Sequence, residues 1–306
     1  MSLFVFLLIV FTGFFAEPAQ GSSQITMTVI YDNYIFKEGT MSDWGFACFI
    51  EGTEKTILFD TGSQGRILLQ NIDTLKIDLD SLDLIVISHS HFDHIGGLNS
   101  ILERKSNVSV YFGTSFPETF SQNITNKGAI PVRVDEPVEI CKHVYSTGEM
   151  HGPVNEQSLI LDTYDGLVII TGCSHPGIVN ILKKAKEILN KDIYLVFGGF
   201  HLLSHSETGI NQIIQEFKAL GVKKCGATHC TGDRAIALFK EAYGEDYIPM
   251  GVGQVIQVST DAGQVRDSDN RQSHILNQFK LDQNFPDPLN GETVIKYHVP
   301  IQSYVN

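Results

Sequence analysis

Cysteine and basic residues are both scarce in this chain, and each shortage excludes a class of protein. Five cysteines in 306 residues are too few for a disulfide scaffold, and their odd number leaves at least one unpaired within the chain. Lys and Arg number 22 against 35 Asp and Glu, which gives a formal net charge of -13. Proteins that bind nucleic acid usually carry clustered Lys and Arg, so we expect no nucleic-acid partner.

Positive side chains are also absent from the start of the N-terminal segment, where an apolar run extends from Leu3 to about Ala16. The run has the length of a signal peptide and falls short of the roughly twenty apolar residues that span a membrane. Ala19 and Gly21 provide small residues for cleavage. We therefore predict that residues 1–21 are a signal peptide and that the protein is secreted or periplasmic. An uncleaved anchor at the same residues, the only membrane contact we expect, is the alternative.

The rest of the chain has the patterning of a folded domain. Apolar residues make up 42% of the sequence, which is enough for a buried core. No internal repeat or low-complexity linker divides it, so we predict one domain over residues 22–264 and a C-terminal extension over 265–306. Strands are expected first, and strands alternating with helices follow, which is typical of packed sheets with helices outside. The expected strands are residues 24–31, 45–50, 56–59, 84–87, 158–161, 167–170 and 193–197, and the expected helices are 65–72, 176–189, 210–220 and 234–243.

Potential metal ligands are concentrated in the six residues from 89 to 94, directly after an apolar strand. Successive side chains of a strand alternate between its faces, so His89 and His91 can project together, and Asp93 and His94 follow in a turn. Neutral imidazoles and carboxylates are the usual ligands of zinc and related divalent ions. A chance group of surface histidines is the alternative, but this spacing favours a metal site.

Further candidate ligands follow three later strands. Cys173 and His175 lie between a predicted strand and a helix, His201 ends another strand, and His229 ends a third. Cys230 comes next in the chain, and in an exported protein it could form a disulfide with Cys225. Since functional residues gather in the loops at the ends of strands, these side chains are candidates for the same site as residues 89–94.

The His-x-His-x-Asp-His motif resembles the signature of the metallo-β-lactamase superfamily. Residues 171–177, 198–201 and 229–232 are similar to those of its branch of dihydropterin-methyl-ribofuranosyl-aminobenzene phosphate synthases and metal-dependent hydrolases. The resemblance covers about residues 25–258 and implies an α/β fold, an αββα sandwich with the metal site at one edge of the two sheets. The chain departs from many relatives by placing Cys173 where a bridging Asp usually follows Thr-Gly, and by lacking a Gly-His-Thr element.

The resemblance implies a site with two divalent ions, with zinc expected and iron or manganese as alternatives. The implied ligands are His89, His91, Asp93, His94, His175 and His229. Cys173 would be either a thiolate ligand or a buried small residue, and His201 either a ligand or a substrate contact. Asp93 would also orient the attacking water, and Asp60 would accept a hydrogen bond from a ligand imidazole.

These residues predict a hydrolase in which a metal-bound hydroxide attacks a small ester, phosphoester or lactone. A transferase of the same fold, acting on pterin and ribofuranosyl-aminobenzene phosphate substrates, is one alternative, and a non-catalytic metal-binding protein is another. Asp60-Thr61-Gly62-Ser63 also matches an aspartic-protease motif, but the chain has no second Asp-Thr-Gly, so such an enzyme would have to act as a dimer. The sequence does not predict the oligomeric state.

Overall fold

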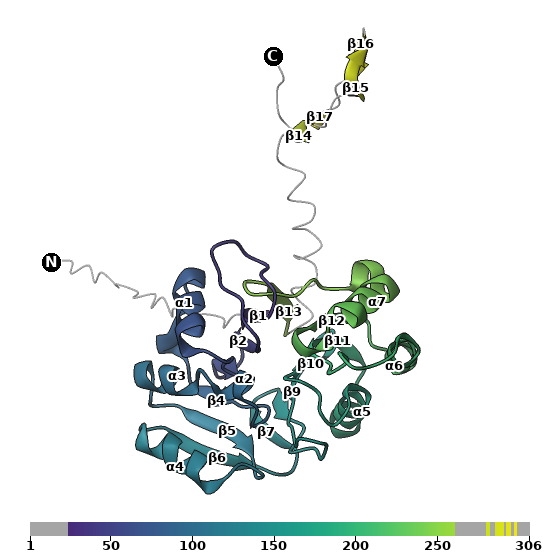
Figure 1. The fold of residues 1–306 in the computed structure, drawn as a ribbon. Helices are drawn as coiled ribbons and strands as arrows, with labels where there is room; N and C mark the ends of the chain where they lie inside the picture. Colours follow the sequence, from purple (N-terminus) through teal and green to yellow (C-terminus); the bar gives the residue numbers. More distant parts are fainter. Residues whose placement is uncertain (1–23, 261–279, 282–284, 291, 295–296, 299–306) are drawn as a thin grey trace, which may run out of the picture.

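The computed structural model describes residues 24–260 and, beyond them, residues 280–281, 285–290, 292–294 and 297–298. Two β-sheets pack face to face and helices cover their outer faces, which confirms the predicted αββα sandwich (Figure 1). The predicted signal peptide at residues 1–21 lies outside this description and stays a prediction. Within the described residues, no helix is both long and apolar enough to cross a membrane.

The first sheet has seven strands in the order β13-β1-β2-β3-β4-β5-β6. The strands β3 to β6 are parallel to one another, and the remaining pairs are antiparallel. Helices α1, α3 and α4 pack on its outer face through an apolar cluster. The bounds are β1 (Gln24–Tyr31), β2 (Ala47–Glu51), β3 (Ile57–Phe59), β4 (Leu84–Val86), β5 (Ser109–Gly113), β6 (Ile130–Val134), β13 (Val255–Ser259), α1 (Gly65–Leu75), η1 (Leu79–Ser81), α2 (Phe92–Ile95), α3 (Leu98–Arg104) and α4 (Glu118–Asn126).

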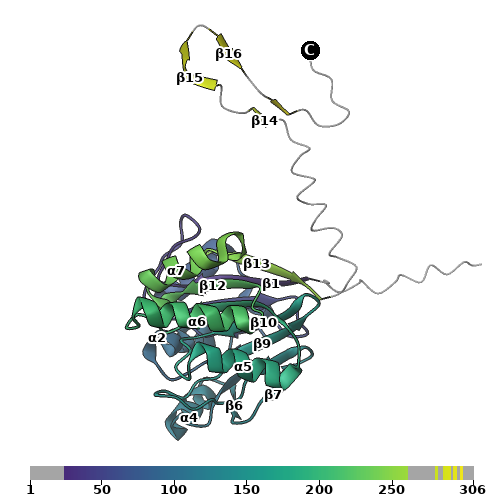
Figure 2. The ribbon, with the colours of Figure 1, turned by 90° about the vertical axis from the view of Figure 1, so that its right-hand side faces the viewer.

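The second sheet has six strands in the order β12-β11-β10-β9-β8-β7, and Figure 2 shows α5, α6 and α7 across its outer face. Its strands β10, β11 and β12 are parallel, so their carboxyl ends meet at one edge. The bounds are β7 (Val138–Cys141), β8 (Val144–Ser146), β9 (Leu159–Thr163), β10 (Gly166–Thr171), β11 (Ile193–Gly199), β12 (Lys224–Thr228), α5 (Ile178–Leu189), α6 (Glu207–Ala219), α7 (Asp233–Tyr243), η2 (His229–Thr231) and η3 (Gly244–Asp246). Four short strands follow, β14 (Lys280–Leu281) paired with β17 (Tyr297–His298) and β15 (Phe285–Asn290) paired with β16 (Glu292–Val294).

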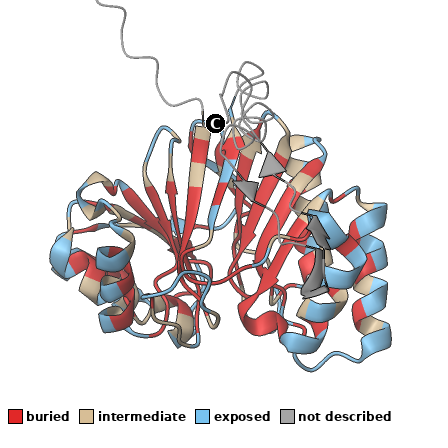
Figure 3. Cartoon of the chain, turned by 90° about the horizontal axis from the view of Figure 1, so that it is seen from above, coloured by how far each residue is buried: buried red, intermediate tan, exposed pale blue. Residues whose placement is uncertain are grey.

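The apolar pattern of each strand explains the layers. In β10, Val168 and Ile170 lie in the cluster between the two sheets, whereas Leu167 and Ile169 lie in the cluster under α5, α6 and α7. Both faces of this strand are therefore buried, as expected for a continuously apolar strand covered by helices. The burial map in Figure 3 shows the same arrangement, with buried strands inside and helices exposed on their outer sides.

Helix boundaries differ from the predictions for local reasons. The helix expected from residue 176 begins at Ile178, because Gly177 has φ 92 and so lies outside the helical region. The helix expected from residue 210 begins earlier, at Glu207, because the side chain of Ser206 caps it by accepting a hydrogen bond from the Gly209 backbone amide.

Candidate metal centre

The candidate ligands meet at the edge of the sandwich where parallel strands of both sheets end. His89 and His91 follow β4, and the next residues form α2. Residues 173–175 follow β10, His201 follows β11, and His229 begins η2 directly after β12. Because these strands end at the same edge, residues far apart in the sequence come within contact distance there.

One group consists of three imidazoles. The Nδ1 atom of His91 lies 3.1 Å from Nε2 of His89 and 3.1 Å from Nε2 of His175. His89 is fully buried, whereas His91 is exposed, so the group lies at the surface end of the site. The structure thus brings together three of the six predicted ligands in one group.

A second group contains the other three predicted ligands and Cys173. The Cys173 Sγ atom lies 3.3 Å from Nε2 of His94 and 3.4 Å from Nε2 of His229. The Asp93 Oδ2 atom lies 3.2 Å from the same nitrogen of His229 and 3.5 Å from that of His94. The rings of His89 and His94 are 4.2 Å apart, so the two groups are neighbours.

Both groups fit a divalent ion. Nitrogen and sulfur ligands bind zinc at about 2.0–2.3 Å in a tetrahedral arrangement, which places ligand atoms roughly 3.3–3.8 Å apart. The separations of 3.1 Å in the first group and 3.2–3.5 Å in the second are close to that range. Imidazole, thiolate and carboxylate donors also suit zinc, and the fold implies a divalent ion without fixing which one.

Asp60 accepts a hydrogen bond from one candidate ligand, His94. Its carboxylate is fully buried and accepts hydrogen bonds from the Ser88 backbone amide, the Ser88 hydroxyl and Nδ1 of His94, each at 2.7 Å. This bond leaves Nε2 of His94 directed at the second group. A carboxylate with all these internal partners cannot serve as the exposed acid of an aspartic protease, so the structure speaks against that alternative.

Two supporting residues were missed by the sequence reasoning because no local motif marks them. The Asn33 Oδ1 atom lies 2.9 Å from Nδ1 of His229 and holds that ring in place. Next to it, the buried Asp32 carboxylate accepts a hydrogen bond from the hydroxyl of Thr228, which precedes the histidine. Burial raises the pKa of Asp32 to about 7.

Glu156 is a third supporting residue that the sequence did not reveal. Its buried carboxylate accepts hydrogen bonds from the backbone amides of Cys173, Ser174 and His175, at 2.8, 2.9 and 2.8 Å. Burial raises its pKa. One side chain therefore fixes the loop that carries a candidate ligand of each group.

A third cluster joins Cys173, His201 and Cys230. Burial would raise the pKa of the Cys230 thiol, but hydrogen bonds to Cys173 and His201 bring it well below its usual range. The hydrogen bond to Cys230 raises the pKa of His201. His201 thus contacts the thiols and lies outside both groups of predicted ligands.

The disulfide considered between Cys225 and Cys230 is absent, since both thiols are free. Cys225 lies on β12 within the apolar cluster under the outer helices. Cys230 lies in η2, where its Sγ atom is 3.5 Å from the carbonyl oxygen of Cys173. The two side chains therefore have different surroundings.

Burial and neighbouring charges shift the pKa values of the candidate ligands. Burial and neighbouring histidines lower the pKa of His175 to about 4, and burial lowers that of His89. Burial would also lower the pKa of His94, but the Asp60 carboxylate raises it to about 9. Burial would raise the pKa of Asp93, yet the hydrogen bond from His229 and nearby positive charge lower it, so this carboxylate is ionised at neutral pH.

The backbone of the site is strained at several residues other than glycine. Asp60, Ser174, His201 and His229 have φ values of 57, 69, 55 and 51°. Left-handed backbone at non-glycine residues costs of the order of 1 kcal/mol each and gathers at functional sites. The strained residues of these loops therefore lie at or beside the candidate ligands.

Comparisons with known proteins agree with this geometry. The family model of the metallo-β-lactamase superfamily matches residues 45–121. The chain is 33% identical over 266 residues to the 7,8-dihydropterin-6-methyl-4-(beta-D-ribofuranosyl)-aminobenzene-5'-phosphate synthase of Methanocaldococcus jannaschii, which covers 71% of this chain and 90% of that protein. The chain therefore belongs to the metallo-β-lactamase superfamily.

Solved structures share the fold. A metal-dependent hydrolase of the β-lactamase superfamily is 30% identical with a TM-score of 0.67, and the match covers 77% of this chain and 99% of that one. The short form of human tRNase Z is 13% identical with a TM-score of 0.53, covering 77% and 99%, and at that identity it supports the fold alone.

Proposed function

We propose that this chain is a metal-dependent hydrolase of small ester, phosphoester or lactone substrates. The observation that carries the proposal is the unequal number of donors in the two neighbouring groups. The second group offers four ligand atoms, whereas the first offers three, from His89, His91 and His175. Structural zinc sites are closed by four protein ligands, and catalytic sites keep one position for water or substrate.

Protein side chains would orient the attacking water and the candidate ligands. Bound ions supply Lewis acidity and lower the pKa of a coordinated water to about 7. Asp93 is held ionised beside His229, and only part of its carboxylate is buried, so it can accept a hydrogen bond from the attacking water and orient it. Asp60 and Asn33 keep the rings of His94 and His229 in one orientation throughout.

Transfer is the second candidate, favoured by the 33% identity to a protein named as a synthase. Ions held by the same ligand groups would supply positive charge for the phosphate of a leaving group, while another nucleophile replaces water. A transferase would release product only when the second substrate is present, whereas a hydrolase needs water alone.

The experiment is a hydrolysis screen of the metal-loaded protein. The panel holds p-nitrophenyl acetate, bis(p-nitrophenyl) phosphate, p-nitrophenyl phosphate and a γ-lactone, each with added zinc, manganese or iron. We expect turnover of at least one substrate, loss of most of it in Asp93→Ala, and no loss in Asp73→Ala, which removes an exposed carboxylate on α1. Turnover that survives both a chelator and Asp93→Ala would refute the proposal.

A further inference from the structure

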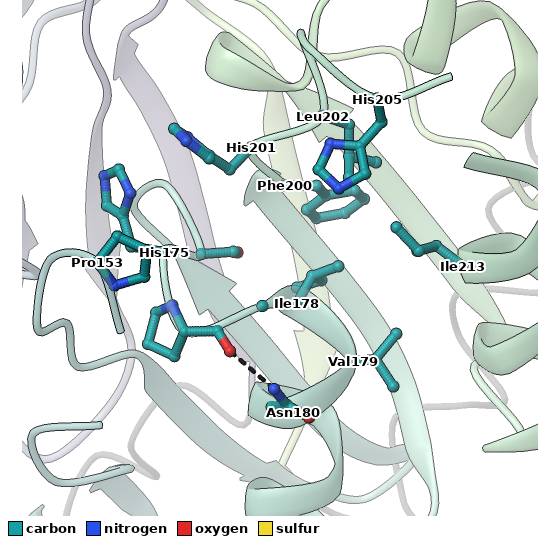
Figure 4. Close-up of a pocket in the computed structure, with 13 residues that line it drawn as sticks. Pro153, His175, Ile178, Val179, Asn180, Phe200, His201, Leu202, His205 and Ile213 are labelled. Carbon is teal, nitrogen blue, oxygen red and sulfur yellow. Dashed lines mark hydrogen bonds between the residues drawn. The ribbon is translucent and has the colours of Figure 1, made fainter. Parts of the chain in front are cut away.

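A cavity of about 380 Å³ adjoins the candidate metal centre, between the loops after β10 and β11 and the helices α5 and α6 (Figure 4). Cavities of about 300–1,000 Å³ are typical of small-molecule sites. His175 is a candidate ligand and also part of the cavity wall, so an occupant would lie directly against the first group. The wall includes Ser174, His175, Val179, Asn180, His201 and Ile213.

The wall of this cavity is mainly apolar and has no Lys, Arg, Asp or Glu side chain. Two of its polar side chains already have partners within the protein. The Ser174 hydroxyl donates to the carbonyl of Gly199 at 2.7 Å, and the Asn180 amide donates to the carbonyl of Pro176 at 2.8 Å. Apart from its histidines, the wall offers no side chain that could pair with a charged group, so burying a charge against the apolar side chains would be unfavourable.

Exposed aromatic side chains lie beside the ligands as well. Trp44 is 48% exposed and its ring lies 5.0 Å from that of His229. Phe92 is 67% exposed and stands between His91 and Asp93 in the chain. Both side chains add exposed apolar surface beside the candidate ligands.

We propose that this cavity binds the uncharged acyl group of a carboxylic ester or lactone, with the reacting bond at the His175 end. The inference rests on the proposed hydrolase function and narrows its substrate class. Substrates whose acyl chain carries a charged group are disfavoured, because the wall provides no Lys, Arg, Asp or Glu side chain to pair with that charge. Apolar side chains such as Ile213 and Val179 would determine the longest acyl chain that the cavity can hold.

The first test measures kcat/KM of the zinc-loaded full chain for the p-nitrophenyl esters of acetate, butyrate, hexanoate and octanoate. Burying one methylene contributes about 0.8 kcal/mol, so we expect a rise of about fourfold per added methylene until the cavity is full. Ile213→Trp and Val179→Phe fill the cavity from two different helices and should each flatten this rise. Ile236→Trp is the matched control, because Ile236 is a half-buried isoleucine on α7 that lines a different cavity.

An unchanged chain-length profile in both filled variants, or a preference for p-nitrophenyl phosphate over every ester, would overturn the inference. A second experiment measures binding without turnover, so the hydrolase proposal and the cavity proposal can fail independently. Binding of the neutral fluorescent probe N-phenyl-1-naphthylamine should be lost in Ile213→Trp and Val179→Phe and kept in Ile236→Trp. If no substrate is hydrolysed, the hydrolase proposal fails, and equal probe binding in all four proteins would refute the cavity assignment as well.

Discussion

At the scale of single residues, the site depends on side chains that never need to touch substrate. Asp60, Asn33 and Glu156 each accept hydrogen bonds from a candidate ligand or from its backbone. Such partners fix the tautomer and orientation of metal ligands, and losing one typically lowers metal affinity 10–100-fold. Of these three, the sequence predicted only Asp60, because it lies in a short motif directly after a strand.

Glu156→Gln tests the loop that carries Cys173 and His175. The amide group of Gln can accept through one oxygen only and turns donors towards the remaining backbone amides, so at least one buried amide loses its partner. We expect the free energy of unfolding in urea to fall by about 1–3 kcal/mol. Glu118→Gln, which changes an exposed carboxylate paired with Arg133, should shift it by less than about 0.5 kcal/mol. Equal stability of Glu156→Gln and wild type would show that this carboxylate does not hold the loop.

Zinc binding should release protons. The pKa of His94 is raised to about 9, so in the metal-free protein this imidazole is protonated at pH 7, and only the neutral form binds an ion. Burial also keeps the Cys173 thiol protonated, because its pKa is raised. Zinc affinity should therefore increase as the pH rises from 6 towards 9.

Calorimetric titration at pH 7 in two buffers of different ionisation enthalpy measures this release. We expect the observed enthalpies to differ between phosphate and Tris. Asp60→Asn removes the charge that raises the pKa of His94, so it should reduce the difference. Identical enthalpies in the two buffers would contradict the account of these charges.

At the scale of elements, strand ends and their following turns determine where the ligands lie. The turn after β3 contains Gly62, which has φ +63 and whose added Cβ would lie 2.4 Å from the ring of Tyr31. The Tyr31 hydroxyl in turn lies 2.8 Å from that of Ser63. The Asp-Thr-Gly-Ser motif is thus a packed turn that presents Asp60 to His94.

Gly62→Ala should destabilise this turn by about 2 kcal/mol or more, through both the left-handed backbone and the clash with Tyr31. Gly244→Ala is the comparison, because Gly244 has φ +54 but open space around it, so only the backbone term applies. Urea unfolding of the two variants measures the difference. A loss in Gly62→Ala no larger than in Gly244→Ala would refute the packing argument.

The sequence predicted most strands with a strong apolar pattern and missed the strands β5, β6, β7, β8 and β13. The strands β1, β4 and β10 are nearly continuous in burial, and all were expected. The edge strands β6 and β7 alternate over only a few residues, and most of these are exposed or half-buried, so the pattern was too short to predict them. Glu156 lies in the irregular loop before β9 and meets Cys173 only in the folded chain, which is why no spacing could reveal it.

At the scale of the whole molecule, each sheet contributes part of the site. The first group combines two histidines after β4 with one after β10, and the second joins residues of α2 with Cys173 and His229. Bound ions would therefore connect the two halves of the sandwich. The sequence predicted that these residues come together only through its resemblance to a known family. The packing of the strands determines the distances between them, and sequence spacing does not reveal that packing.

Removing metal should therefore lower the stability of the whole domain. A ligand at 1,000 times its Kd stabilises the folded state by about 4 kcal/mol, which for a domain of this size is a shift of the order of 10 °C in Tm. Differential scanning calorimetry with and without a chelator measures the shift. Equal Tm values would mean that no ion joins the two halves.

The most direct test of the central claim is the zinc content of the purified, zinc-saturated chain, measured by elemental analysis. We predict about two ions per chain in the wild type, about one in His175→Ala and about one in the double variant Cys173→Ala/His229→Ala, since each change leaves only two donors in a different group. His151→Ala, which changes an exposed histidine outside both groups, should retain two. No bound zinc in the wild type, or two ions in all four proteins, would contradict the dinuclear centre.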